Sequence, residues 1–202
     1  MGNNPIVGGF FMECKKIFDT SEKNCVFGIR DTLTDYLKPV IESSRPIVIL
    51  CVGTDRSTGD CLGPLVGEKL KFLDRNNIFV YGTLKNPVHS KNLVETISQI
   101  KSKHKSSYIL AIDACLGSVQ NIGKIVIQNK PLSPGAAMNK DLPQVGDISI
   151  TGIVNISGGL EFMVLQNTRL FTVMQLADMI SQGIYHSILK TLGGKRNTVN
   201  II

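Results

Sequence analysis

Apolar residues in this chain gather in short continuous runs, each of which ends at residues typical of turns. These runs, in chain order, cover residues 47–53, 78–83, 108–113, 122–128 and 148–156. The first of them, PIVILCVG, ends abruptly at Gly53 and is followed by a polar loop. Uninterrupted apolar runs of this length are typical of strands that are buried on both faces of a parallel sheet. The pattern therefore predicts a strand in each run.

Between these runs, apolar residues recur every three or four positions, which predicts amphipathic helices. The predicted helices cover residues 28–43, 63–75, 93 to the lysine-rich segment 101–105, and 170–191. Pro39 is expected to disturb the last turns of the first helix. Residues 130–147, which are rich in proline and glycine, are expected to form a long ordered loop, and loops of that length are often functional.

Strands that alternate with helices indicate an α/β fold with a mostly parallel sheet and helices on both faces. We expect one domain over residues 46–192, preceded by a helical lead-in over 1–45 and followed by a flexible tail over 193–202. In a doubly wound sheet of order 2-1-3, the strand at 47–53 lies between those at 78–83 and 108–113.

Composition narrows the classes of function. The net charge is +6, but the basic residues are scattered and no stripe with interleaved aromatic residues is present, so no nucleic-acid partner is expected. No apolar run reaches the roughly 18 residues that a membrane span needs, and the N-terminus lacks the order of a secretory signal. The five cysteines are odd in number without C-x-x-C spacing, which favours a reducing cytoplasm over a disulfide framework.

Two carboxylates stand where ligands bind in open α/β sheets. Asp60 follows the first strand and precedes a predicted helix, and Asp113 ends the strand at 108–113. If those strands are neighbours, about 4.8 Å apart, the two side chains converge over one sheet edge. Paired carboxylates suit general acid–base hydrolysis, and they equally suit a divalent metal. A third interpretation is that Asp60 only caps the following helix and Asp113 only caps a turn.

Other reactive side chains give weaker signals. Cys61 and Cys115 lie beside the two aspartates, and adjacent carboxylates raise the pKa of a thiol, so both are interpreted as buried filler. Of the histidines, only His89 follows a strand and is a candidate third metal ligand. Thr54 and Ser57 are predicted to orient water or substrate.

Two sets of motifs carry a resemblance to known families. Gly59-Asp60-Cys61-Leu62-Gly63-Pro64, with Ile112-Asp113-Ala114, resembles two blocks of the spore germination protease (GPR) family. A longer resemblance, over about residues 45–190, is to YyaC-type sporulation proteins, which are regarded as relatives of that protease. Its motifs are PGA at 134–136, NK at 139–140, LP at 142–143, VGDISITG at 145–152 and NTRL at 167–170.

The resemblance implies a three-layer αβα fold of the phosphorylase/hydrolase-like kind, shared with hydrogenase-maturation peptidases. It implies that Asp60 and Asp113 are the catalytic pair of an aspartic-type endopeptidase, with Pro134 and Gly135 bordering the substrate groove. The implied partner is a protein or peptide substrate, such as small acid-soluble spore proteins, in the cytoplasm of sporulating cells or spores. No cofactor and no resident metal are expected, and a homo-oligomer stays possible. Two alternatives stay open: a non-catalytic regulatory or binding protein of sporulation, and a metal-dependent hydrolase.

Overall fold

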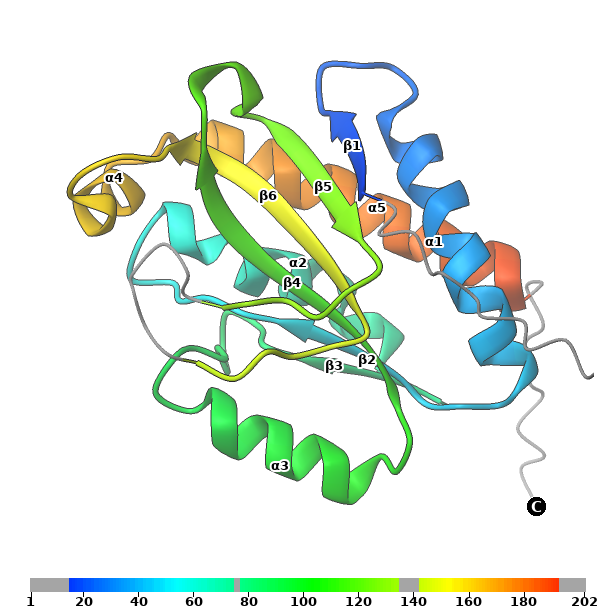
Figure 1. Ribbon diagram of the computed structural model, residues 1–202. Coiled ribbons are helices and arrows are strands. Elements are labelled where there is room, and N and C mark those ends of the chain that lie inside the picture. The colour runs from blue at the N-terminus through cyan, green and yellow to red at the C-terminus, as the bar shows by residue number, and fades with distance from the viewer. Residues whose placement is uncertain (1–14, 75–76, 135–141, 193–202) are drawn as a thin grey trace, which may run out of the picture.

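A computed structural model describes residues 15–74, 77–134 and 142–192 (Figure 1). The described strands are β1 (Lys15–Asp19), β2 (Ile47–Cys51), β3 (Ile78–Tyr81), β4 (Tyr108–Gly117), β5 (Lys124–Gln128) and β6 (Ile148–Ile156). The described α-helices are α1 (Cys25–Glu42), α2 (Leu62–Leu70), α3 (Leu93–Lys103), α4 (Glu161–Gln166) and α5 (Leu170–Leu192). Short 3-10 helices are η1 (Gly59–Cys61), η2 (Lys71–Leu73) and η3 (Val119–Asn121).

The described strands form one six-stranded sheet in the order β1-β5-β6-β4-β2-β3. Strands β3, β2, β4 and β6 run parallel to one another, while β5 and β1 complete the sheet with antiparallel pairings. The expected neighbours are confirmed, because β2 lies between β3 and β4. Three of the five pairings are parallel, so the sheet is mostly parallel, as predicted.

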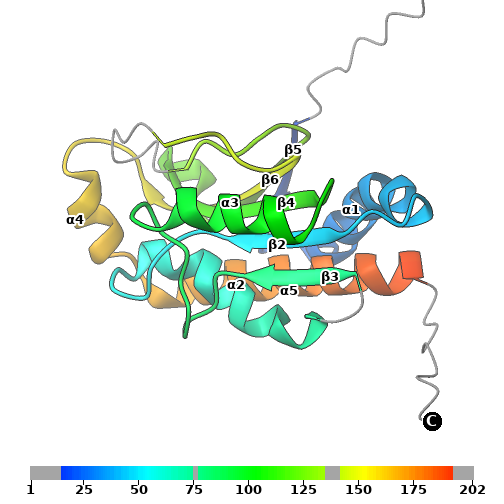
Figure 2. The ribbon, with the colours of Figure 1, turned by 90° about the horizontal axis from the view of Figure 1, so that it is seen from below.

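Helices cover both faces of the sheet, and the alternation of side chains along β2 shows why. Ile47, Ile49 and Cys51 belong to a core shared with α1, α2 and α5, whereas Val48 and Leu50 belong to a core shared with α3. Figure 2 shows α3 on one side of the sheet and α2 and α5 on the other. Successive side chains of a strand point to opposite faces, so a run that is apolar throughout requires cover on both. The three-layer αβα fold is thus confirmed.

The segment expected as a helical lead-in contributes to the same core over its described residues. Helix α1 begins at Cys25, three residues before the predicted start, and continues through Pro39 to Glu42. Its Ile29, Leu33 and Leu37 are fully buried. Strand β1 was not predicted; it pairs antiparallel with β5 and extends the sheet at that edge.

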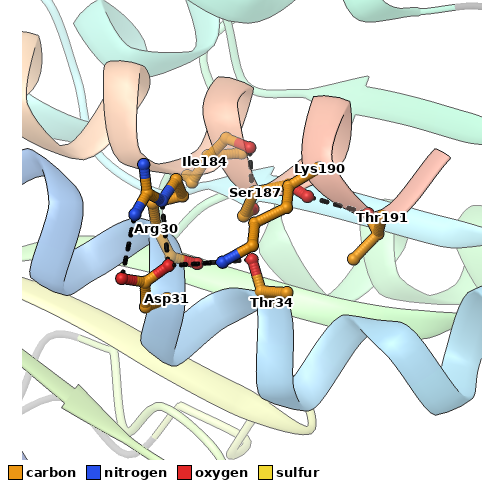
Figure 3. A network of polar contacts seen from close by, with 7 residues as sticks. All are labelled: Arg30, Asp31, Thr34, Ile184, Ser187, Lys190 and Thr191. Carbon is orange, nitrogen blue, oxygen red and sulfur yellow. Dashed lines mark hydrogen bonds and ion pairs between the residues drawn. The ribbon is translucent and has the colours of Figure 1, made fainter. Parts of the chain in front are cut away.

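Polar contacts also join α1 to α5 (Figure 3). The Asp31 carboxylate accepts hydrogen bonds from Arg30 on its own helix, at 2.9 Å, and from Lys190 on α5, at 2.8 Å. These contacts, with the Arg30 hydrogen bond first, hold the pKa of Asp31 well below its usual range. Because the pair is exposed, it contributes little to stability. The apolar contact beneath it is what holds the two helices together.

On the other face, His104 is built into the packing around α3. Its ring stacks on Phe79 with centroids 3.7 Å apart, and its Nε2 lies 2.9 Å from the Tyr81 hydroxyl. Burial, followed by the charge of Lys103, lowers the pKa of His104 below its ordinary value. This geometry gives His104 a structural role.

The lowered pKa of His104 predicts a pH dependence of stability. Because protonation is harder in the folded chain than in the unfolded one, the stabilising contribution is present above about pH 6.5 and is lost as the pH falls below it. Urea unfolding at a series of pH values should show the free energy of unfolding falling more steeply between about pH 7 and pH 5 in the wild type than in His104→Phe. Equal slopes would contradict a neutral, packed His104.

None of the described helices is long and apolar enough to cross a membrane. The last predicted helix is confirmed as α5, and the strands at 122–128 and 148–156 are confirmed as β5 and β6. Of the loop expected at 130–147, the two ends are described, and Leu132 and Val145 exchange main-chain hydrogen bonds of 2.8 and 2.9 Å across it.

Candidate active site

Asp60 is held at the end of β2 by main-chain contacts of the loop that contains it. After the last residue of β2, the Val52 amide donates to the Ile112 carbonyl at 2.7 Å. Gly53 then turns the chain with φ +141, a conformation that favours glycine, and Thr54 donates its amide to the Asp60 carbonyl at 3.1 Å. The loop is therefore closed on itself, and Asp60, in η1, returns to the strand end from which it started.

Asp113 lies one position beyond the last pairing of β2 with β4. The expectation that Asp113 ends its strand is wrong, because β4 continues to Gly117 and Asp113 pairs with Thr151 of β6. Strand β2 stops earlier, however, at the pair Cys51–Ile112. Asp113 therefore lies where one neighbouring strand has ended. The residue is buried, 7% exposed, and its carboxylate accepts a hydrogen bond from the Ala114 amide at 2.8 Å.

The two aspartates line one cavity of about 1150 Å³ at this end of the sheet. Cα atoms of η1, which contains Asp60, lie within 8 Å of Cα atoms of β4, which contains Asp113. The other sequence-predicted residues in its lining are Thr54, Ser57, His89 and Pro134. Gly135, the remaining residue expected to border the groove, lies outside the described residues.

The third interpretation, in which Asp60 caps helix α2 and Asp113 caps a turn, does not agree with the structure. Helix α2 has Cys61 as its N-cap, and no side-chain hydrogen bond caps it. Asp113 is inside a strand rather than at a turn. Both carboxylates are therefore placed by the fold beside the same cavity, and neither is the N-cap of α2.

Ser57 contributes an unusual feature to the cavity. The residue is 9% exposed, and its Oγ is the buried side-chain oxygen among the described residues that has no hydrogen-bond partner. A buried hydroxyl without a partner costs about 1–3 kcal/mol relative to one that is satisfied. A bound water or ligand in the cavity would supply that partner.

Helix α4 forms a wall of the cavity that sequence reasoning missed. Leu160 and Phe162 line the cavity, yet they are 74% and 57% exposed. The helix packs against η1 and β6 and lies at the end of the sheet in Figure 1. It has only six residues, too few to show a helical period, although the mostly apolar LEFMVL segment after Gly158-Gly159 was a signal that this segment packs against the domain.

Two cationic residues, Arg56 and Lys91, also line the cavity and were not predicted from the sequence as site residues.

The cysteines beside the aspartates are not poised as nucleophiles. Burial, with Asp113 acting in the same direction, raises the pKa of the Cys115 thiol to about 11. Burial also raises the pKa of Cys61, and Asp60 adds to that effect. Since the thiolate is the nucleophile, a raised pKa disfavours a nucleophilic role for either thiol at neutral pH.

We therefore expect iodoacetamide at neutral pH to label Cys61 and Cys115 at least about tenfold more slowly in the folded protein than in urea. Labelling of each cysteine is read from peptide masses after digestion, and the urea sample is the control for intrinsic reactivity. Fast labelling of either thiol in the folded protein would reopen the possibility of a cysteine nucleophile.

No group of three His, Cys, Asp or Glu side chains gathers closely enough to hold a metal ion within the described ranges. His89 shares the cavity with both aspartates but does not complete such a group with them. The donor set expected for a metal-dependent hydrolase is therefore not assembled by the described residues.

Comparisons with known proteins bear on the family rather than on the chemistry. Residues 17–183 match the family described as "Protein of unknown function (DUF1256)". The chain is 52% identical over 142 residues to "Uncharacterized protein YyaC" of Bacillus subtilis (strain 168), and the match covers 70% of this chain and 69% of that protein.

Among solved structures, the chain is similar to the NiFe hydrogenase maturation protease HycI from Thermococcus kodakarensis KOD1. That match has 18% identity and a TM-score of 0.49 and covers 77% of this chain and 99% of the other. A likeness of this strength carries no conclusion about activity. The family match and the identity to YyaC do show the family: the chain belongs to the DUF1256 proteins, as its resemblance to YyaC-type proteins led us to expect.

Proposed function

We propose that this protein is a peptidase of the germination-protease type that uses Asp60 and Asp113 as a general acid–base pair. The observation that supports the proposal most strongly is that the two carboxylates line the same cavity, although they are 53 residues apart in the sequence. Carboxylates that come from separate segments and meet at one cavity can divide the roles of acid and base between them.

In the proposed reaction, an ionised carboxylate of the pair takes a proton from a water molecule as the water oxygen attacks the peptide carbonyl carbon. The other carboxyl group, protonated at the start, gives its proton to the amide nitrogen as the C–N bond breaks. The products are a carboxylic acid and an amine, and the pair is left with one proton, as it began. The two roles are not assigned to individual aspartates.

Neighbouring groups fit the binding of a polypeptide. The unpartnered hydroxyl of Ser57 would hydrogen-bond the attacking water or the substrate backbone, and Thr54 lies in the same loop. Leu160, Phe162 and the buried Pro134 give the cavity apolar walls for a substrate side chain. Substrate cavities commonly combine mostly apolar walls with a few convergent polar groups.

The proposed substrates are small acid-soluble spore proteins, in the cytoplasm of sporulating cells or spores, because the resemblance to the germination protease implies them. The experiment is to incubate the wild-type protein with such a protein over a range of pH and to follow intact masses. Discrete fragments support an endopeptidase. The absence of fragments at every pH would favour the alternative, a regulatory protein that keeps the fold without the chemistry.

A chelator added to the same incubation separates the metal-dependent alternative. If fragments form, we expect them to form equally fast with and without a chelator. Cleavage that stops with chelator and returns with a divalent cation would replace the acid–base mechanism with a metal-dependent one.

A further inference from the structure

A second cavity, of about 690 Å³, runs beside the outer edge of β3. The C-terminal half of β3 and the turn after it line its floor, from Val80 to Thr83. Asn92, Glu95 and Gln99 of the α3 region form one wall, and Lys71 and Asp74 at the end of η2 form the other. Helices α3 and α2 cover opposite faces of the sheet (Figure 2), and the lining of the groove comes from the edge strand and from residues on both of those sides.

The main-chain groups of β3 point alternately to β2 and to this groove. Strand β3 is last in the sheet, so no described strand pairs with its outer side. The Ile47 amide of β2 donates to the Asn77 carbonyl at 2.8 Å, and Ile47 is in register with Ile78. In a parallel pair with that register, the groups of Phe79 and Tyr81 also face β2, while those of Ile78 and Val80 face outward. The groove is therefore lined by the donors and acceptors of an open sheet edge.

The groove adjoins the aspartate cavity. Pro87 and His89 line both cavities. The segment that contains them is fixed to the end of β2, because Val88 bridges Val52 and its carbonyl accepts a hydrogen bond from the Gly53 amide at 2.7 Å. Gly53 begins the loop that holds Asp60. A chain that lies along β3 and passes its C-terminal end thus reaches the segment that borders both cavities.

We propose that the outer edge of β3 binds the polypeptide substrate as an added strand and directs it past His89 to Asp60 and Asp113. The inference rests on the proposed peptidase function and names how its substrate is held. The occupant is an unfolded or extended segment, because only an extended chain can pair with a strand edge. Main-chain pairing supplies affinity without demanding one sequence. The polar walls, with Lys71, Asp74 and Glu95, suit a segment that carries polar side chains of both signs.

The test removes one outward donor without touching the pairing inside the sheet. Val80→Pro deletes an amide that faces the groove, and proline is tolerated on the open side of an edge strand. Val80→Ala is the matched control, because it shortens the same side chain and keeps the amide. With a fluorescently labelled small acid-soluble spore protein as the probe, we expect Val80→Pro to bind about 5–10-fold more weakly than Val80→Ala, as for the loss of one main-chain hydrogen bond.

Binding is measured in an Asp60→Asn background, so that the result does not depend on cleavage. If the wild type cleaves the probe and the KM of Val80→Pro equals that of Val80→Ala, the edge proposal is wrong and the peptidase proposal stands. If nothing is cleaved but Val80→Pro still binds the probe more weakly than Val80→Ala, the edge proposal stands and the peptidase proposal fails.

Hydrogen exchange gives a readout that does not require the proline variant to fold. The amides of Ile78 and Val80 should become protected from exchange when the probe binds to the Asp60→Asn protein. Protection confined to other surfaces, with these two amides unchanged, would overturn the proposal. Protection that appears without the probe and rises with protein concentration would also overturn it, because the edge would then pair with a second copy of the chain.

Discussion

Replacing Gly63 with alanine should lower the free energy of unfolding by about 3 kcal/mol. A Cβ atom at this position of α2 would lie 2.0 Å from the Val52 carbonyl oxygen and 2.8 Å from both the nitrogen and the carbonyl carbon of the same residue. These are main-chain atoms, and Val52 is fixed by its hydrogen bond to Ile112 and its bridge to Val88. The helix must therefore move away from the strand, since the strand cannot yield.

The same displacement should disturb the site. Asp60 lies three residues before Gly63, and its carbonyl would lie 2.0 Å from a Cβ atom on Gly53, so the loop and the helix start are packed as one unit. Gly67, one turn later, stands in the same relation to the Gly82 carbonyl, at 2.1 Å. Close approach of α2 to β2 and β3 is thus what brings Asp60 to the sheet edge. We expect Gly63→Ala to lose cleavage as well as stability.

Gly158→Ala is the matched control for this prediction. Gly158 lines the aspartate cavity, but an added Cβ there has no heavy atom within 4 Å. Its effect on the free energy of unfolding, measured by urea titration followed by circular dichroism, should stay within about 0.5 kcal/mol. Equal midpoints for the two variants would show that α2 and β2 are not in the close contact described.

Asp60→Asn and Asp113→Asn should each reduce kcat by a factor of about 10² to 10⁴ while leaving the fold intact. Asparagine has the shape of aspartate, but its amide can neither accept nor release a proton near neutral pH. Asp35→Asn is the control for the loss of one negative charge. Asp35 is an exposed residue of α1 and does not line the cavity. The Asp35→Asn variant should cleave at the wild-type rate.

The pH dependence of kcat/KM distinguishes a catalytic from a structural role of these carboxylates. If each aspartate transfers a proton, one limb of the wild-type profile should disappear in Asp60→Asn and the other in Asp113→Asn. A uniform drop at every pH, with both limbs kept, would mean that the substitutions only disturb the site.

The parts of the fold that the sequence predicted are those fixed by local pattern. An apolar run such as Ile47–Cys51, buried at every position, specifies a central parallel strand without knowledge of its partners. The order of β3, β2 and β4 was taken from the 2-1-3 order of doubly wound sheets rather than from the residues, and that order brought Asp60 and Asp113 to one edge.

The parts that were missed depend on distant partners. Strand β1 has the sequence KKIFD, and its strand conformation is stabilised by pairing with β5, more than 100 residues later. The unpartnered hydroxyl of Ser57 and the approach of α4 to η1 are likewise properties of packing. No periodicity in the chain records which atoms fail to find a partner.

The groove along β3 was equally invisible in the sequence, because nothing in the residues around Pro87 and His89, which line both cavities, indicates an open sheet edge. Their position is held by the bridge between Val52 and Val88, two residues that are 36 positions apart in the sequence.

The central claim is that Asp60 and Asp113 act together in peptide hydrolysis, and the double variant Asp60→Asn, Asp113→Asn tests it most directly. A small acid-soluble spore protein is incubated with the wild type, with each single variant and with the double variant, and fragments are counted by intact mass. Groups that act as a unit are strongly non-additive, so the double variant should cleave no more slowly than the slower single variant. Fragments produced by the double variant at the wild-type rate would contradict the account, because the cavity would then cleave without either carboxylate.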